Sequence, residues 1–229
     1  MLKELDRGAI QLTVTPTDTL NQDQREFLKM LVDESTRPVT WVGSFNTPGD
    51  YDSYLGKLAA VEDLLGRDKL VPMTTCHPIK FQFHLRNPVI LGLFEVFRPV
   101  MAMELEQKVE QYRSQEFRQK FVADVENNEA LGSDFWHRVR LIDGEREQTL
   151  RLAESKKTIA DMAAKTGKQP VDILFDIAFD DDLGAIFELV TLNHDPGEVI
   201  PLIKDERLII GLSDAGAHVD MMCDAGFGT

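Results

Sequence analysis

The chain has 229 residues, 43% of them hydrophobic, so it is long enough to bury a sizeable core. Its formal net charge of -14 argues against nucleic acid and anionic membranes as partners, because phosphate-rich surfaces attract basic proteins. No apolar run approaches the ~20 residues that cross a bilayer, and the acidic start does not resemble a signal peptide. Cys76 and Cys223 make no disulfide framework, which fits a reducing compartment. We therefore expect a cytoplasmic protein.

The first third of the chain alternates strand-like and helix-like segments. The β-prone runs are 9–14, 37–43 and 69–74, and the segments with helical spacing of apolar residues are 21–34 and 51–65. Because the connections are short, each helix must return the chain to the same edge of a sheet. This pattern predicts parallel strands and an α/β fold.

The middle of the chain has a different pattern. Residues 89–127 are helical in spacing and rich in charge, which indicates two or three surface helices outside the α/β repeat. Residues 128–148 are polar, and we expect them to be irregular, with Trp136 as an anchor. This stretch is therefore interpreted as a helical insertion followed by a loop.

The α/β pattern returns in the last third. The expected elements are helices at 157–166, 171–179 and 196–204 and a strand at 187–192. Thr158 suits the N-cap of the first helix, Gly167 its end, and Pro170 the start of the second. Residues 207–212 are β-branched and uncharged after the first position, which makes this run the most convincing candidate for a buried strand in the chain.

A carboxylate follows this strand in the run Gly211-Leu212-Ser213-Asp214-Ala215-Gly216-Ala217-His218. A nucleophile elbow would need glycine at Ala215, with the acid and histidine partners further along the chain. A phosphate loop would need Lys and Ser or Thr at Ala217 and His218. The third interpretation is a metal-binding Asp214. A carboxylate is a hard anionic ligand that binds divalent cations together with imidazoles, and barrels place their catalytic groups at this end of a strand.

Residues 208–227 resemble the last-strand signature of amidohydrolase family 3, which includes the N-acyl-D-amino-acid deacylases. Residues 158–173 are similar to the helical stretch that this family places before its final strands, and the early strands fit its middle barrel strands more loosely. The resemblance implies a (β/α)₈ barrel with one or two Zn²⁺ ions. It also implies that the last-strand Asp, matched here only by Asp214, binds metal and acts as general base and acid.

This chemistry has a direct physical reason. A metal makes its bound water more acidic and polarises the amide carbonyl, and a neighbouring carboxylate can carry the water's proton to the leaving nitrogen. We expect Asp214 to be catalytic and metal-binding, and His218 and Ser213 to contact the substrate. Each has a plainer interpretation: Asp214 as a helix N-cap, His218 as packing on the first helical turn, and Ser213 as a turn residue.

Other candidate residues have weaker support. Cys76 and His77 follow the third strand and would face the same end as Asp214, although a loop pair is the simpler interpretation. His84, in an alternating segment, and His194, in a turn before a helix, are interpreted as structural.

The sequence also departs from the family pattern. It contains no H-x-H pair, which the family uses as metal ligands, and a full barrel needs ~250 residues. We therefore expect residues 1–229 to form a partial TIM-like barrel domain with a helical insertion at about 89–127. The predicted function is that of a metal-dependent amidohydrolase fragment, which when complete hydrolyses non-peptide C–N bonds such as those of N-acyl-D-amino acids. The alternative is a catalytically inactive half-barrel with a structural or partner-binding role.

The expected partner is a small-molecule N-acyl amino acid or related amide, and Zn²⁺ is the expected cofactor. A homo-oligomer is compatible with the sequence.

Overall fold

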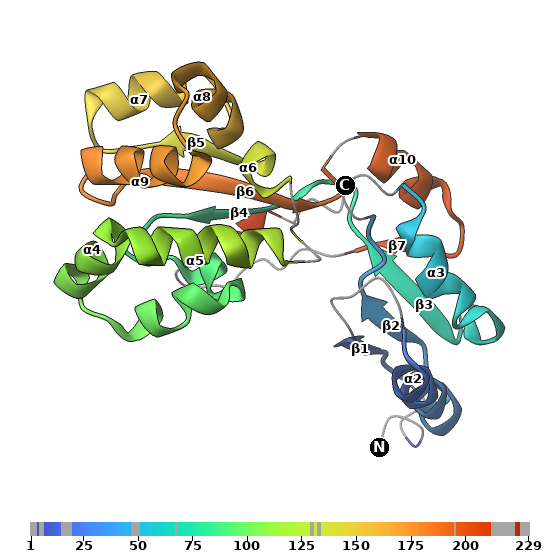
Figure 1. The fold of residues 1–229 in the computed structure, drawn as a ribbon. Coiled ribbons are helices and arrows are strands. Elements are labelled where there is room, and N and C mark those ends of the chain that lie inside the picture. The colour runs from blue at the N-terminus through green and yellow to red at the C-terminus, as the bar shows by residue number, and fades with distance from the viewer. Residues whose placement is uncertain are drawn as a thin grey trace. The chain divides into compact units, whose positions relative to one another are not determined.

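The computed structural model describes residues 4, 7–14, 20–46, 51–66, 68–128, 131, 134–194, 196–211 and 223–224. The described residues of Met1–Ile79 and Thr191–Ala215 form one compact unit, and those of Lys80–Val190 form another. The structure is mixed α/β with a parallel sheet, as the sequence predicts (Figure 1). No closed barrel is found among the described residues.

The first unit contains a four-stranded sheet in the order β1-β2-β3-β7, in which every neighbouring pair is parallel. Its elements are β1 (Ile10–Thr13), α2 (Gln22–Ser35), β2 (Val39–Val42), α3 (Ser53–Ala59), the 3-10 turn η1 (Glu62–Leu64), β3 (Leu70–Thr74), α10 (Pro196–Lys204) and β7 (Ile209–Ile210). The register pairs Ile10 with Val39 and Val39 with Leu70. Three expected strands and their two helical connections are thus confirmed within a few residues.

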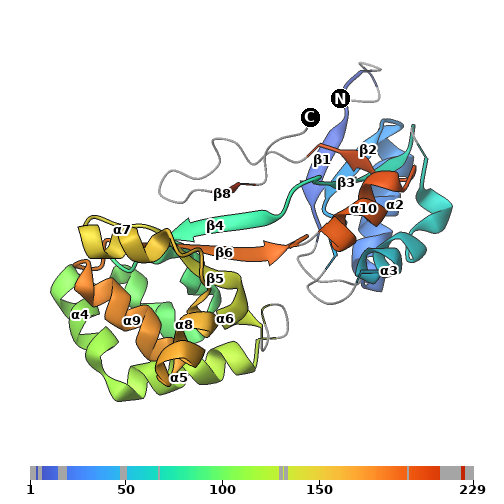
Figure 2. The same cartoon turned by 90° about the horizontal axis from the view of Figure 1, so that it is seen from above.

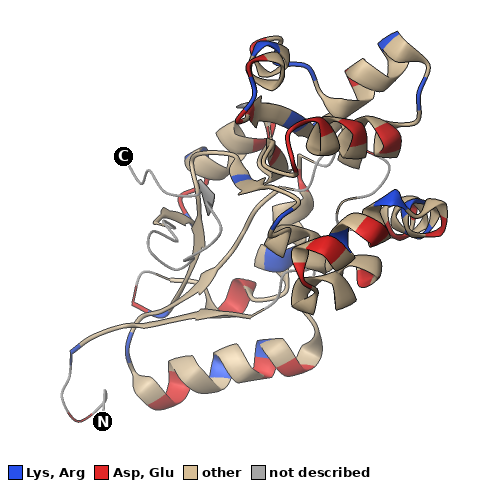
Figure 3. Ribbon diagram, turned by 90° about the vertical axis from the view of Figure 1, so that its left-hand side faces the viewer, with Lys and Arg blue, Asp and Glu red and all other residues tan. Residues whose placement is uncertain are grey.

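Local sequence explains where α2 begins and how it packs. The Asn21 side chain accepts the N–H of Gln24, and the Gln24 side chain accepts the N–H of Asn21, both at 2.9 Å, which forms a capping box. Leu28 of this helix is fully buried with Val39 and Trp41 of β2. The four strands carry no charged residue, and Figure 3 shows the charges of this unit on its helices and loops.

The prediction of a buried last strand is wrong. β7 has only two residues, and Ile209 and Ile210 are 42% and 40% exposed. Among the described residues β7 pairs only with β3, so it forms an edge of the sheet. An apolar, β-branched run favours a strand, but burial depends on what covers it, and that is not encoded locally.

The second unit combines helices with a four-stranded sheet in the order β5-β6-β4-β8. Its elements are β4 (Ile79–Phe83), the 3-10 turns η2 (Val89–Leu93), η3 (Glu95–Phe97) and η4 (Pro99–Ala102), α4 (Leu105–Arg113), α5 (Gln115–Glu126), α6 (Phe135–Arg138), β5 (Val139–Asp143), α7 (Glu147–Ala153), α8 (Ile159–Thr166), α9 (Pro170–Asp180), β6 (Ile186–Leu192) and β8 (Cys223–Asp224). β5 and β6 are antiparallel, and β4 lies beside β6 (Figure 2). The helical insertion expected at about 89–127 lies inside this unit.

Two expectations about this unit need correction. The stretch 128–148 is not irregular throughout, since it contains α6 and β5. Phe135, Val139 and Leu141 are almost completely buried. The hydrophobic effect places these apolar side chains in the core although most of their neighbours in the sequence are polar. In addition, α5 is not a purely surface helix: it buries Phe117 and Phe121 in an aromatic core.

The expected helix ends in this unit are confirmed. Thr158 caps α8, where its hydroxyl accepts the N–H of Asp161 at 3.1 Å. Gly167 ends the helix with a φ of 72°, which glycine adopts without a steric penalty. Pro170 is the first residue of α9. In the part of the chain that the structure describes, no helix is both long and apolar enough to cross a membrane.

Candidate functional site

The carboxyl edge of the parallel sheet is the edge at which the chain leaves β2, β3 and β7. Ser44, just beyond β2, donates its N–H to the carbonyl of Met73 at 2.9 Å. Gly211, directly after β7, donates its N–H to the carbonyl of Thr74 at 3.1 Å. These segments therefore emerge side by side. In α/β folds, ligand-binding and catalytic side chains are found at this edge.

Buried polar side chains gather near this edge, and we call them the carboxyl-edge cluster. Its members are Ser44, Asn46, Lys57, Thr74, Thr75, Asn193 and Glu198. Burying polar groups costs free energy unless they are hydrogen-bonded, so such a concentration calls for a structural or functional reason.

Two asparagines hold the cluster together. The N–H of Asn46 donates to Oδ1 of Asn193 at 3.1 Å, and the N–H of Asn193 donates to the Asn46 carbonyl at 3.3 Å. Nδ2 of Asn193 donates to the carbonyl of Thr75 at 3.3 Å, and Nδ2 of Asn46 donates to the carbonyl of Glu198 at 2.7 Å. These bonds join the segments after β2 and β3 to the start of α10.

Asn193 also sets the direction of the chain. Its φ is 52°, in the left-handed region that asparagine tolerates better than most residues. A residue in this conformation costs of the order of 1 kcal/mol and persists where its surroundings require it. Here the reciprocal bonds with Asn46 supply that requirement, and the residue that follows the bend is His194.

His194 and Glu198 form the closest pair of titratable groups at this edge. Nδ1 of His194 lies 2.5 Å from Oε1 of Glu198, and the backbone N–H of His194 donates to Oε2 at 2.5 Å. The Glu198 side chain is 0% exposed, whereas the His194 side chain is 35% exposed. A buried carboxylate thus contacts both the backbone N–H and the ring nitrogen of a partly exposed histidine.

Two further polar groups belong to the cluster. Nζ of Lys57, on α3, donates to the carbonyl of Gly43 at 3.1 Å, and the residue is almost completely buried. The hydroxyl of Ser44 is buried and makes no hydrogen bond among the described residues. The cluster therefore contains a cation and a hydroxyl besides the histidine–carboxylate pair.

Tyr54, in the first turn of α3, is tied to Asp205, which directly follows α10. Burial raises the pKa of the Tyr54 hydroxyl, and its hydrogen bond to the Asp205 carboxylate adds to the shift. The Arg207 guanidinium, which donates to both Asp205 oxygens at 2.9 and 2.5 Å, holds the pKa of that carboxyl below its usual value. Asp205 therefore stays ionised and keeps the two helices together.

The three site residues predicted from sequence, Ser213, Asp214 and His218, lie outside the described residues. Cys76 and His77 follow β3 at the carboxyl edge, where the N–H of His77 donates to the Thr75 hydroxyl at 3.3 Å. These residues and His194 bring thiol and imidazole donors, which suit Zn²⁺.

The fit to a metal is only partial in the described part of the chain. There, no group of three or more His, Cys, Asp or Glu side chains comes together in a way that could hold a metal ion.

A cavity of about 640 Å³ opens at the opposite edge of the same sheet. Its lining includes Val39, Leu70 and Ile209, which lie at the starts of β2, β3 and β7. The lining is mainly apolar, with Glu206 and Arg207 as its charged residues. This cavity and the carboxyl-edge cluster thus lie at different edges of the sheet, and we assign the chemistry to the carboxyl edge.

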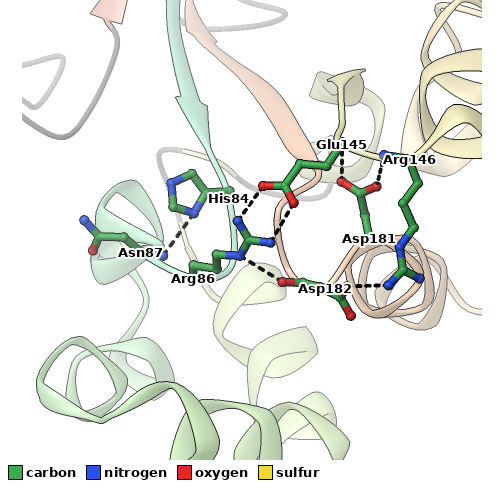
Figure 4. A network of polar contacts seen from close by, with 7 residues as sticks. All are labelled: His84, Arg86, Asn87, Glu145, Arg146, Asp181 and Asp182. Carbon is green, nitrogen blue, oxygen red and sulfur yellow. Dashed lines mark hydrogen bonds and ion pairs between the residues drawn. The ribbon is translucent and has the colours of Figure 1, made fainter.

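The second unit has a polar network of its own, drawn in Figure 4. The Arg86 guanidinium donates to both carboxylate oxygens of Glu145, at 2.5 and 3.0 Å. These hydrogen bonds raise the pKa of Arg86 and lower the pKa of Glu145. Nδ1 of His84 accepts the N–H of Asn87 at 3.2 Å. Burial, together with the neighbouring Arg86, lowers the pKa of His84, which therefore acts as a neutral acceptor in a turn.

No family model, curated protein or solved structure matches this chain. Function must therefore be inferred from the residues. Sequence reasoning missed Asn46, Asn193 and Glu198. The available signal was positional: Asn46 and Asn193 each follow a strand by one to four residues, and Glu198 lies in the first turn of the helix that comes next.

Proposed function

We propose that this chain carries the last-strand portion of a metal-dependent amidohydrolase barrel. Its reaction is hydrolysis of non-peptide amide bonds, such as those of N-acyl-D-amino acids. The observation that supports this most strongly is the placement of β7. This strand pairs in parallel with β3 and lies within residues 208–227, the stretch that resembles the amidohydrolase signature.

The sheet order supports the partial TIM-like barrel. Consecutive strands of such a barrel are parallel neighbours in chain order, and β1, β2, β3 and β7 follow this rule. The second unit enters between β3 and β7 as an insertion. β7, which precedes Asp214 in the chain, is then the last of this series.

The proposed residue roles follow from that position. Asp214 binds the metal and moves the proton of the attacking water, while Ser213 and His218 contact the substrate. Zn²⁺, when bound, supplies Lewis acidity and a more acidic water. The substrate is a small N-acyl amino acid or related amide in the cytoplasm.

The test combines metal analysis with turnover. The chain is purified with Zn²⁺, its metal content is measured by mass spectrometry, and hydrolysis of N-acetyl-D-amino acids and their L enantiomers is followed. We expect Asp214→Asn to lower kcat/KM by about 10²–10⁴-fold, the usual contribution of a group that transfers protons. Asp33→Asn, the same change on the exposed face of α2, should have no effect. Full activity of Asp214→Asn would refute the role of Asp214.

The second candidate is a catalytically inactive half-barrel with a structural or partner-binding role. The absence of an H-x-H pair from the sequence favours it. The same metal analysis separates the two candidates. Stoichiometric, tightly bound Zn²⁺ in the unaltered chain counts heavily against the inactive half-barrel, whereas metal-free protein without turnover favours it.

A further inference from the structure

The amino edge of the parallel sheet, where the chain enters its strands, contains the cavity of about 640 Å³. Ala9, Pro38 and Leu208 directly precede β1, β2 and β7, and all three line this cavity. Leu65 and Gly66, ahead of β3, complete this part of its wall. Every lining residue belongs to the first unit. The cavity is therefore built by one compact unit, at the opposite end of the strands from the carboxyl-edge cluster.

The wall of the cavity is mainly apolar. Backbone groups at this edge are already paired: the N–H of Ile10 donates to the Pro38 carbonyl at 2.9 Å, and the N–H of Gly66 donates to the Leu70 carbonyl at 3.1 Å. Most of the side chains that line the hollow are those of Pro, Val, Leu and Ile. Such a wall favours a ligand whose surface is largely apolar.

Ile209 leaves part of this wall open to water. Its side chain lines the cavity, and the residue is 42% exposed. A ligand that covers apolar surface gains the free energy of its burial. The volume equals that of about twenty water molecules at ~30 Å³ each, so the cavity can hold a molecule of about 10–20 non-hydrogen atoms. This volume is within the usual range of small-molecule sites.

The two charged residues of the lining differ in their partners. Nε and Nη2 of Arg207 donate to the two carboxylate oxygens of Asp205, at 2.9 and 2.5 Å, so a neighbouring anion balances this cation. Glu206 is exposed and makes no hydrogen bond or ion pair among the described residues. The unbalanced charge of the lining is thus a carboxylate. The net charge of -14 also favours the approach of a cation.

We propose that this cavity binds an apolar primary amine, whose alkyl or aryl body fills the hollow and whose ammonium group lies beside Glu206. The inference does not depend on the amidohydrolase reaction, because it concerns binding at the other edge of the sheet. An alcohol of the same shape keeps the apolar contacts but lacks the attraction to Glu206. A carboxylate of the same shape is repelled by it.

The first experiment is titration calorimetry of the unaltered chain at neutral pH with phenylbutylamine, phenylbutanol and phenylbutyrate. We expect the amine to bind about two- to fivefold more tightly than the alcohol, the usual range for an exposed ion pair, and the carboxylate to bind most weakly. Phenylethylamine, which is two methylenes shorter, should bind about tenfold more weakly than phenylbutylamine. Absence of amine binding, or equal binding of amine and carboxylate, would overturn the proposal.

Substitutions at Glu206 test the charge. Glu206→Gln should abolish the advantage of the amine and leave the affinity for the alcohol unchanged. Glu206→Lys should reverse the order, so that the carboxylate binds more tightly than the amine. Glu34→Gln, the same change at an exposed position of α2 away from the cavity, is the control and should alter none of the affinities. An amine preference that survives in Glu206→Lys rules out the contact with Glu206.

Two neighbouring substitutions locate the ligand. Ile209→Trp fills the cavity from a 42% exposed position, whereas Ile210, 40% exposed, does not line it, because successive strand residues point to opposite faces. With circular dichroism and urea midpoints confirming that both variants fold, Ile209→Trp should weaken all three ligands at least about tenfold and Ile210→Trp less than about twofold. Equal effects would show that the ligands bind elsewhere.

Light scattering on the same samples tests a different occupant. A dimer of the unaltered chain that Ile209→Trp dissociates, together with no amine binding, would show that a second copy covers the cavity, and the proposal would be wrong. Amide hydrolysis is measured separately. A chain that binds the amine without any turnover contradicts the proposed function and leaves this site intact, whereas turnover without amine binding does the reverse.

Discussion

Asp181 offers the sharpest test of how the second unit is held together. Its side chain is 0% exposed, and it accepts the N–H of Glu145 and the N–H of Arg146, each at 2.8 Å (Figure 4). Arg146 is the N-cap position of α7, and no side chain of its own caps that helix. A carboxylate from the end of α9 therefore caps the start of α7 from a distance in sequence.

The cost of removing this carboxylate follows from its contacts. Hydrogen bonds to a charged acceptor contribute about 1.5–3 kcal/mol each, and loss of a cap costs about 0.5–2 kcal/mol, with overlap between the two because the same N–H groups are involved. We expect Asp181→Ala to lower the free energy of unfolding of this unit by about 3 kcal/mol. Asp181→Asn keeps one acceptor oxygen and should lose about half as much.

The assay is urea denaturation followed by tryptophan fluorescence. The chain has two tryptophans, and Trp41→Phe leaves Trp136, which packs on Phe121 in the second unit, as the only reporter. Asp180→Ala is the matched control, since this neighbouring side chain is exposed and its removal should change stability by less than about 0.5 kcal/mol. Equal losses for the two alanine variants would refute the capping role of Asp181.

Acid should reveal the same interaction. Burial alone would raise the pKa of Asp181, but the N–H groups of Glu145 and Arg146 outweigh it, so the pKa lies below its ordinary value of 3.8. The unfolded chain therefore binds this proton more readily than the folded chain. The stabilisation is fully present above the unfolded pKa and is lost as the pH falls through the folded pKa. Asp181→Asn should show a weaker loss of stability in this acid range.

Two further predictions concern the aromatic core of the second unit. Phe121→Ala should lower the free energy of unfolding in urea by about 3–5 kcal/mol, because the ring is fully buried among other rings. Phe27→Ala is the control: its side chain is 46% exposed, so the loss should be well under half as large. Burial raises the pKa of the Tyr112 hydroxyl, which donates to the Leu85 carbonyl at 3.1 Å. The free energy of unfolding should therefore fall as the pH rises above about 10, the pKa of tyrosine in the unfolded chain. Tyr112→Phe should flatten that alkaline dependence in the same assay and lower stability at neutral pH by about 1–3 kcal/mol.

Features that depend on a few neighbouring residues could be predicted from the sequence. The ends of α8 and the start of α9 follow from the capping chemistry of Thr158, Gly167 and Pro170. The parallel order of β1, β2 and β3 follows from short helical connections, which allow little else. In each case the decisive interaction lies within one element or between successive elements.

Features that depend on distant contacts could not be predicted. β5 was missed because its strand character comes from pairing with β6, in which Val139 lies opposite Leu189. The burial of β7 was overestimated because nothing in Ile209 or Ile210 records whether a further layer covers them. The asparagine bonds of the candidate site join residues 147 positions apart, and neither asparagine belongs to a local motif.

The same asparagines explain how an inserted unit can leave the carboxyl edge intact. The chain leaves the first unit at Ile79 and returns at Thr191, whose hydroxyl donates to the Ile79 carbonyl at 3.1 Å. Pairing of β4 with β6 brings these two points together. Contacts in the core of the second unit therefore offset most of the conformational entropy lost when the long loop closes. Asn193 then needs only to bend the chain toward Asn46 for His194 to reach its position. The position of this histidine is thus determined by contacts at the junction of the two excursions of the chain.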